Sequence, residues 1–253
     1  MNKLLRQIRR MSGSAIAPVF EVEAIRRYVM ARAVPLSIQK QDYPTLEAKH
    51  LDNPRLFTNR TDLISSMRSV RGGVIAEVGV GIGDFSEYLL NALQPKKFVG
   101  FDIFTMHEWA RLGGGPWRGI SETNILLENM THLDYYKRRS ADRSSQVSIE
   151  VGMSSVNLTK YPNKTFDLIY IDGDHSYDGV KQDANLAKAK LADNGVIVFN
   201  DYIMFDHLNG VTYGVVQAVN ELIVGEDWRV CGFSLEKNMF CDIAIRKQSG
   251  LPW

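Results

Sequence analysis

The stretch VIAEVGVGIGDFS, residues 74–86, most constrains the fold, because an apolar segment runs directly into a glycine-rich turn and then a helical pattern. Its first five residues are typical of a buried strand, and residues 85–93 return to helical spacing. We therefore expect Gly79, Gly81 and Gly83 at a strand-to-helix corner, where a backbone can approach a ligand closely and offer amide donors.

The spacing of this turn also discriminates between ligands. The dinucleotide fingerprint would place its third glycine at position 84, which is an aspartate here. Glu77, inside the motif, is expected to direct a carboxylate toward the ligand, which suits a cation and repels a phosphate. The motif therefore favours a cationic ligand over a pyrophosphate.

Length, charge and hydropathy narrow the class of protein. The 253 residues, 45% of them hydrophobic, suffice for one sizeable core. Lys and Arg number 30 against 29 Asp and Glu, so the formal charge of +1 gives no global field for nucleic acid or a membrane surface. No apolar run approaches the ~20 residues of a membrane span, and no secretory signal is recognised. Residues 1–20 are basic and free of acids, which fits an N-terminal arm or a transit peptide.

Cys231 and Cys241 are too few for a disulfide framework and indicate a reducing compartment, so we expect a cytoplasmic protein. They flank a predicted hairpin and could face each other across it, although two free thiols are favoured.

Strand and helix patterns alternate along the rest of the chain. Further strands are predicted at residues 97–101, 146–151, 166–171 and 195–199, helices at 178–191 and 212–224, and a closing antiparallel pair at 228–233 and 240–246. This order predicts an α/β, Rossmann-like, mostly parallel sheet with helices on both faces and an antiparallel C-terminal hairpin strand. We assign residues 1–70 to an N-terminal helical arm or lid and residues 71–253 to the ligand-binding domain.

Ligands of such sheets bind outside the carboxyl ends of the strands, and polar residues gather there in this sequence. Asp102 follows the glycine turn by about 20 residues and can accept hydrogen bonds from a ribose diol, or else cap a helix or turn. Ser154, beyond the next strand, is a candidate for the edge of an adenine ring.

The densest group of titratable residues follows two later strands and comprises Asp172, Asp174, His175 and Asp201, with Asn200 beside them. Carboxylate and amide oxygens suit Mg²⁺, Mn²⁺ or Ca²⁺, and such an ion could hold two oxygens of a diol-like acceptor. His175 could then take the acceptor's proton at neutral pH, with Asp174 as the competing base. The alternative is that the acids only cap helices and turns.

Residues 71–246 resemble class I S-adenosylmethionine-dependent methyltransferases. Within that superfamily, FDLIYIDGDHSYDGV at residues 166–180, with Asn200, Asp201 and Tyr202, resembles the group that includes the macrocin and mycinamicin sugar O-methyltransferases. The resemblance implies a seven-stranded sheet with Glu77 and the glycines near the methionine moiety.

The resemblance also assigns roles to the polar residues. It implies that Asp102 binds the ribose, that a divalent metal binds at Asp172, Asn200 and Asp201, and that His175 is the base. The metal-dependent relatives tend to carry two acids, or an acid then Asn, where this chain has Asn200 then Asp201. That order keeps two oxygen ligands but removes one negative charge relative to an acid pair.

We therefore predict a methyltransferase that moves the methyl group of S-adenosylmethionine to a hydroxyl of a sugar or other small molecule, with Mg²⁺ or Mn²⁺. The predicted cofactor-binding residues are Glu77, Gly79, Gly81, Gly83, Asp102, Ser154 and Asp172. Alternatives are a metal-independent N- or O-methyltransferase, a dinucleotide-binding oxidoreductase and a non-catalytic module. We expect a small-molecule partner, no nucleic acid or membrane partner, and a possible homo-oligomer, since the N-terminal region of the sugar-modifying relatives tends to form lids and subunit contacts.

Overall fold

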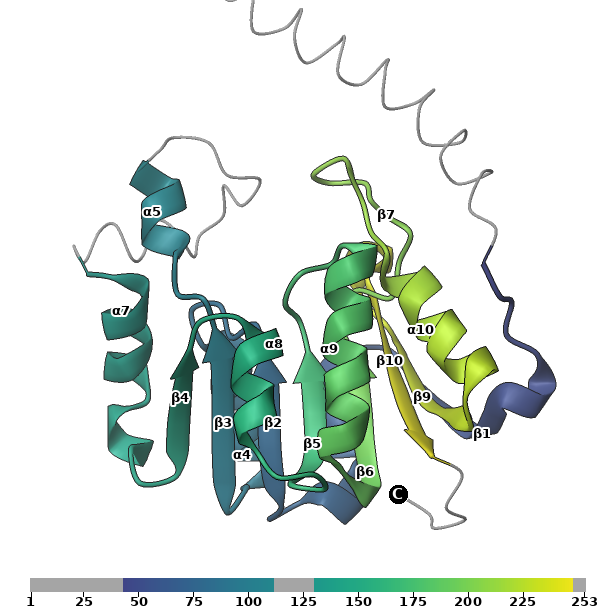
Figure 1. Cartoon of the computed structure of the whole chain (residues 1–253), viewed down its shortest axis with the longest axis horizontal. Coiled ribbons are helices and arrows are strands. Elements are labelled where there is room, and N and C mark those ends of the chain that lie inside the picture. Colours follow the sequence, from purple (N-terminus) through teal and green to yellow (C-terminus); the bar gives the residue numbers. More distant parts are fainter. Residues whose placement is uncertain (1–42, 112–129, 248–253) are drawn as a thin grey trace, which may run out of the picture. The chain divides into compact units, whose positions relative to one another are not determined.

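The computed structural model describes residues 43–111 and 130–247, without the side chains of 109–111 (Figure 1). Most of the predicted N-terminal arm, residues 1–42, lies outside the described residues. Its remaining part, residues 43–70, belongs to the same compact unit as the sheet, which extends from Tyr43 to Trp253.

The described residues form an eight-stranded sheet in the order β1-β9-β10-β6-β5-β2-β3-β4. Its strands are β1 (Leu51–Phe57), β2 (Val74–Val78), β3 (Lys97–Asp102), β4 (Val147–Val151), β5 (Phe166–Ile171), β6 (Leu191–Phe199), β9 (Trp228–Leu235) and β10 (Cys241–Lys247). Only β10 runs antiparallel to its neighbours, β6 and β9. The predicted α/β class and the antiparallel C-terminal strand are confirmed.

The sheet has eight strands. The expected number of seven is wrong, because the edge strand β1 is an additional strand. Its sequence, LDNPRLF, lacks a regular apolar alternation and contains Pro54, which a strand tolerates at the edge of a sheet. An ion pair links β1 to β10, a strand inside the sheet. Arg246 of β10 donates to the Asp52 carboxylate of β1 at 2.6 Å and 2.9 Å. Neither feature is visible as a strand pattern in the sequence.

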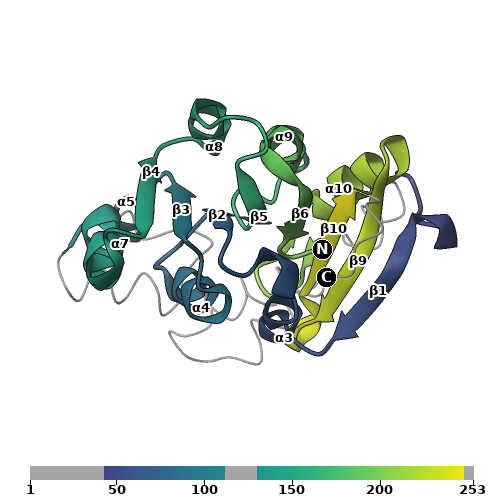
Figure 2. The same ribbon diagram turned by 90° about the horizontal axis from the view of Figure 1, so that it is seen from below.

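Helices cover both faces of the sheet (Figures 1 and 2). Helices α8 (Ser154–Asn157), α9 (Tyr177–Lys190) and α10 (Val215–Gly225) lie on one face, and α3 (Arg60–Ser65) and α4 (Asp84–Leu93) lie on the other. The remaining elements are α5 (Met106–Arg111), α7 (His132–Arg139), a small hairpin of β7 (Phe205–Asp206) and β8 (Val211–Thr212), and the 3₁₀ turns η1 (Ala48–His50), η2 (Arg68–Val70), η3 (Ala141–Arg143), η4 (Leu158–Lys160) and η5 (Lys237–Met239). Among the described helices none is both long and apolar enough to cross a bilayer.

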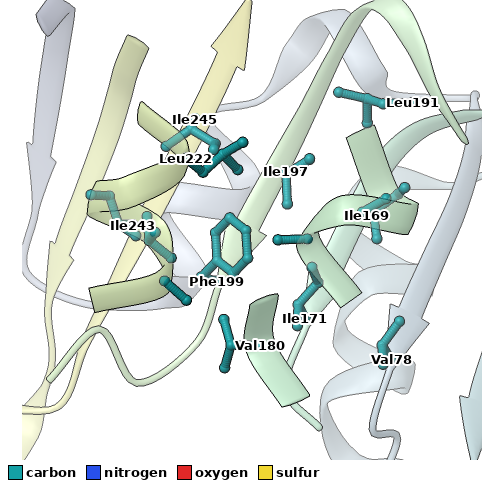
Figure 3. Close-up of a cluster of buried hydrophobic side chains, with 14 of the residues drawn as sticks. Val78, Ile169, Ile171, Val180, Leu191, Ile197, Phe199, Leu222, Ile243 and Ile245 are labelled. Atoms are coloured by element: carbon teal, nitrogen blue, oxygen red, sulfur yellow. The ribbon is translucent and has the colours of Figure 1, made fainter. Parts of the chain in front are cut away.

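Successive side chains along each strand point to opposite faces of the sheet, so the core has two layers. Ile169 and Ile171 of β5 pack with Ile197 and Phe199 of β6 beneath α9 and α10 (Figure 3). The intervening residues, such as Tyr170, face α3 and α4 on the opposite side of the sheet. Each such buried side chain contributes about 1.5–3 kcal/mol, so a register shift that exchanges the two faces is strongly disfavoured. The carboxyl ends of β2, β3, β5 and β6 are therefore held together at one edge.

Candidate active site

The glycine turn has the backbone that the sequence predicts. Gly79, Gly81 and Gly83 have φ angles of 83°, 51° and 90°, in the left-handed region that glycine adopts readily. The turn also lies against the end of β5, because a Cβ at Gly79 would stand 2.0 Å from the carbonyl oxygen of Asp172. These residues form a backbone cradle that side chains at these positions would obstruct.

Asp102 lies beside the cradle. Its Oδ2 accepts hydrogen bonds from the backbone N–H groups of Val80 at 3.0 Å and Gly81 at 3.2 Å, and its Oδ1 accepts from Phe104 N–H at 2.7 Å. Its carboxylate therefore holds the turn in shape, and its predicted contact with a ribose stays a prediction.

Glu77 lies in β2, the strand that leads into the glycine turn, and its side chain is buried. Its carboxylate accepts a hydrogen bond from the Ser86 hydroxyl, which in turn accepts one from the Tyr136 hydroxyl at 3.0 Å. Burial raises the pKa of Glu77 to about 8, although the Ser86 hydrogen bond and the nearby Arg60 oppose the shift. Strand alternation directs this side chain toward Ser86 of α4, and its predicted place near the methionine moiety of a cofactor stays a prediction.

Ser154 is the first residue of α8, beyond the end of β4. Its hydroxyl donates to Asp183 of α9 at 2.6 Å, so the side chain already has a protein partner. Its predicted role at an adenine edge stays a prediction.

His175 lies at the centre of the second cluster. Its Nε2 atom lies 3.6 Å from Asp172 Oδ1 and 3.9 Å from Asp201 Oδ2, beyond hydrogen-bond distance, and is buried without a hydrogen-bond partner among the described residues. The ring stacks on Tyr213, with centroids 4.6 Å apart. Burial lowers the pKa of His175, and the Asn200 side chain opposes the shift. The imidazole is therefore neutral at physiological pH and can accept a proton.

Two carboxylates face this imidazole. Burial and the neighbouring Asp201 raise the pKa of Asp172 well above its ordinary value. Burial and Asp242 raise the pKa of Asp201 to about 7, and Arg60 opposes the shift in both carboxyl groups. Asp201 also has a φ of 51°, a conformation that is costly outside glycine and that is concentrated at functional sites.

Asn200 belongs to a buried polar network behind these acids. Its amide nitrogen donates to Asp242 Oδ1 at 3.0 Å and to the Tyr170 hydroxyl at 3.2 Å, and Tyr170 donates to Asp242 Oδ2 at 2.7 Å. All three side chains are buried, so this arrangement fixes the orientation of the Asn200 amide.

The predicted Mg²⁺ or Mn²⁺ site at Asp172, Asn200 and Asp201 stays a prediction. Across the described ranges, no three or more His, Cys, Asp or Glu side chains are placed to hold a metal ion. The hydrogen bonds from Asn200 to Tyr170 and Asp242 use its amide nitrogen, and the guanidinium of Arg60 lies 3.9 Å from Asp172 Oδ2. A cation provided by the chain therefore already lies beside one of the three predicted ligands.

Asp174, the competing base, is exposed. Its carboxylate accepts hydrogen bonds from the backbone N–H and the hydroxyl of Ser176, both at 2.9 Å, and Ser176 is the N-cap of α9. This contact supports the turn before α9, whereas His175 faces Asp172 and Asp201.

Sequence reasoning missed Arg60, Tyr170, Tyr213 and Asp242. Asp242 had a detectable signal, because it is an acid within the apolar strand β10. The other three have no sequence pattern that distinguishes them from core or surface residues, and only the fold brings them to the site.

Comparison with known families decides the class of protein. Residues 76–202, half of the chain, match the profile of a family described as a methyltransferase domain. The chain belongs to this methyltransferase family. The match begins inside β2 and ends just after Asp201, so it contains the glycine turn, His175 and both acids that face it. The prediction of a methyltransferase is confirmed.

Solved structures support the methyltransferase fold. The O-methyltransferase TomG from Streptomyces achromogenes, involved in tomaymycin synthesis and solved in complex with SAM, has a TM-score of 0.51 and 16% identity over 74% of this chain and 79% of its own. A candidate rRNA methylase from Clostridium thermocellum has a TM-score of 0.51 and 15% identity over 75% of this chain and 94% of its own. At these identities the likeness shows the fold alone. No match was found among curated proteins.

Proposed function

We propose that this methyltransferase transfers the methyl group of S-adenosylmethionine to a hydroxyl oxygen of a small molecule such as a sugar, with His175 as the base. The observation that carries the proposal is the buried, unpartnered Nε2 atom of His175, which lies at the same edge of the sheet as the glycine cradle.

The cradle supports S-adenosylmethionine as the methyl donor. A nucleoside needs close approach to the backbone, and the space at Gly81 is open, since a Cβ there would meet only the Met106 methyl group at 3.7 Å. Asp102 on one side of the turn is available to the ribose, because a carboxylate has about four acceptor positions and its described contacts use three. When bound, this cofactor supplies an electrophilic methyl group on a sulfonium sulfur.

His175 supplies the proton transfer. Its neutral Nε2 accepts the acceptor's hydroxyl proton while the oxygen forms its bond to the methyl carbon, and the carbon–sulfur bond breaks with its electron pair left on sulfur. The imidazolium that forms is stabilised by the Asp172 and Asp201 carboxyl groups, 3.6 Å and 3.9 Å away. Proton removal by a positioned base typically contributes 10²–10⁴-fold to the rate.

The proposed reaction assigns no step to a metal ion, because the described His, Cys, Asp and Glu side chains form no group of three or more that could hold one. This choice corresponds to the metal-independent alternative from the sequence.

The free and buried thiols of Cys231 and Cys241 agree with a reducing compartment such as the cytoplasm. In the hairpin Cys241 pairs with Leu235 and not with Cys231, so the two do not face each other.

The test has two stages. Calorimetry with S-adenosylhomocysteine and with NAD should show uptake of the first nucleoside only. A radiolabelled methyl group should then be transferred to members of a panel of sugars, phenols and amines, with products separated as ethers or methylamines. Binding of NAD alone would overturn the proposal, and methylation confined to amines would replace O-methylation with N-methylation.

A further inference from the structure

Arg60 brings a guanidinium to the carboxyl edge of the sheet, beside Asp172. It is the first residue of α3, in a segment that precedes the matched family domain. Its Nη1 lies 3.9 Å from Asp172 Oδ2 and 3.4 Å from the Tyr170 hydroxyl. Since the Asp172 carbonyl lies against Gly79, this positive charge stands at one end of the glycine cradle.

The fold holds this guanidinium in place. Its Cζ lies over the ring of Phe85, 4.3 Å from the ring centroid, as in a cation–π contact. The backbone N–H of Arg60 donates to the Glu236 carboxylate, in the turn between β9 and β10. The planar group is therefore oriented before any ligand binds, which lowers the entropic cost of a contact.

Arg60 retains capacity for another partner. A guanidinium has five N–H donors, and among the described residues the side chain of Arg60 makes one long hydrogen bond, to Tyr170, and an ion pair at 3.9 Å with Asp172. Its side chain is 35% exposed, unlike those of Tyr170 and Asp242 beneath it. A planar anion with two oxygens is the ligand that this geometry fits best.

The order of the strands indicates which part of the cofactor reaches this point. Asp102 ends β3, on one side of β2, and Asp172 follows β5, on the other side. A nucleoside with its ribose at Asp102 and its chain across the glycines therefore directs its amino acid end toward Asp172 and Arg60. That end carries a carboxylate, which the guanidinium of Arg60 beside Asp172 is placed to bind.

We propose that Arg60 binds the carboxylate of the amino acid moiety of S-adenosylmethionine. This inference rests on the proposed function and adds a binding residue outside the matched domain. It assigns to α3 a direct role in cofactor recognition, because α3 places a guanidinium beside Asp172 at this edge of the sheet.

The experiment compares two nucleosides that differ in one group. Calorimetry measures S-adenosylhomocysteine and its decarboxylated analogue, S-adenosyl-3-thiopropylamine, against the full-length wild-type protein, Arg60→Met and Arg60→Lys. The wild type should bind S-adenosylhomocysteine roughly 10- to 100-fold more tightly than the analogue, as expected for charge-assisted hydrogen bonds to a carboxylate. Arg60→Met should abolish this preference and leave affinity for the analogue within about threefold. Arg60→Lys, which keeps the charge without the planar fork, should retain part of the preference.

Arg71→Met is the matched control, because Arg71 is exposed and bonds to Gln94 at the opposite end of β2. It should bind both nucleosides like the wild type. The proposal is overturned if the wild type does not distinguish the two nucleosides, or if Arg60→Met weakens both equally. Should Arg60→Met fail to fold, Arg60→Lys decides, since an unchanged preference in that variant also overturns bidentate binding. A wild type that binds neither nucleoside contradicts the proposed function itself.

Discussion

The imidazole of His175 lies flat against the ring of Tyr213, with an interplanar angle of 7°. The Tyr213 hydroxyl donates to Asp206 at 3.2 Å, and the backbone N–H of Gly214 donates to the carbonyl of His175 at 2.8 Å. The segment after the β7–β8 hairpin thus fixes both the ring and the main chain of the proposed base. A base held in this way needs little reorganisation to take a proton.

Replacement of His175 tests its role as the base. His175→Gln should lower kcat by about 10²–10⁴-fold, because a positioned general base is lost, and should leave the Kd of S-adenosylhomocysteine nearly unchanged. Steady-state kinetics and calorimetry measure the two quantities. Asp174→Asn is the control, since this exposed neighbour bonds to Ser176, and it should keep most of the activity. The reverse ranking would make Asp174 the base.

The pH dependence of methyl transfer follows from the buried environment of His175. Burial lowers its pKa from 6.5, and the neutral form is the active one. Activity should therefore rise with pH through an inflection below 6.5 and then level off. Tyr213→Ala, which uncovers the ring, should move that inflection upward. A kcat/KM profile for both proteins measures the shift, and identical profiles would show that Tyr213 does not set the pKa.

Substitutions of Gly79 and Gly72 can be compared to test the close contact between the glycine turn and the end of β5. Both have positive φ, 83° and 73°, but a Cβ at Gly72 meets nothing within 4 Å, whereas one at Gly79 would strike the Asp172 backbone. Gly72→Ala should cost about 1–2 kcal/mol from backbone strain alone. Gly79→Ala should cost more than ~3 kcal/mol, because a backbone group must move as well. Urea unfolding gives both free energies, and equal losses would mean that the turn and β5 are not in contact.

Glu77 should make stability fall as pH rises. Burial raises its pKa from 4.5 to about 8, so the folded state holds a proton that the unfolded chain releases. The destabilisation should grow from about pH 4.5 and be complete above about pH 8, on the order of a few kcal/mol. Glu77→Gln keeps an acceptor for Ser86 without the charge. In thermal unfolding, the Tm of this variant should rise relative to the wild-type Tm as pH increases from 5 to 9. A constant difference in Tm would mean that Glu77 ionises normally.

Asn200→Asp tests the metal assignment. The substitution removes a donor to Asp242 and Tyr170 and places a second carboxyl group 3.0 Å from Asp242, so the variant should unfold at a lower temperature. Added MgCl₂ should not restore its Tm, and EDTA should not lower wild-type activity. Recovery of the Tm with Mg²⁺, or loss of activity with EDTA, would show that a divalent ion does bind at this edge.

Much of the sheet and part of the site could be predicted from the sequence. Residues 74–78 and 166–171 are strands as predicted, because a short apolar run between turn signals has few other stable arrangements. Strand β1 could not be predicted, since its residues are mostly exposed and contain Pro54, and its position depends on pairing with β9 and on Asp52 meeting Arg246.

Local pattern alone determined the glycine turn, the placement of Asp102, Asp172, His175 and Asp201 at strand ends, and hence the edge on which chemistry would occur. Only the tertiary structure decided which way each side chain faces: Glu77 toward Ser86, Asn200 inward toward Asp242, and His175 against Tyr213. Arg60 likewise reaches the site only because α3 packs beside α4. Backbone conformation follows from neighbours in sequence, whereas charge pairing and burial depend on tertiary contacts, such as that between Arg60 and Tyr170, 110 residues apart.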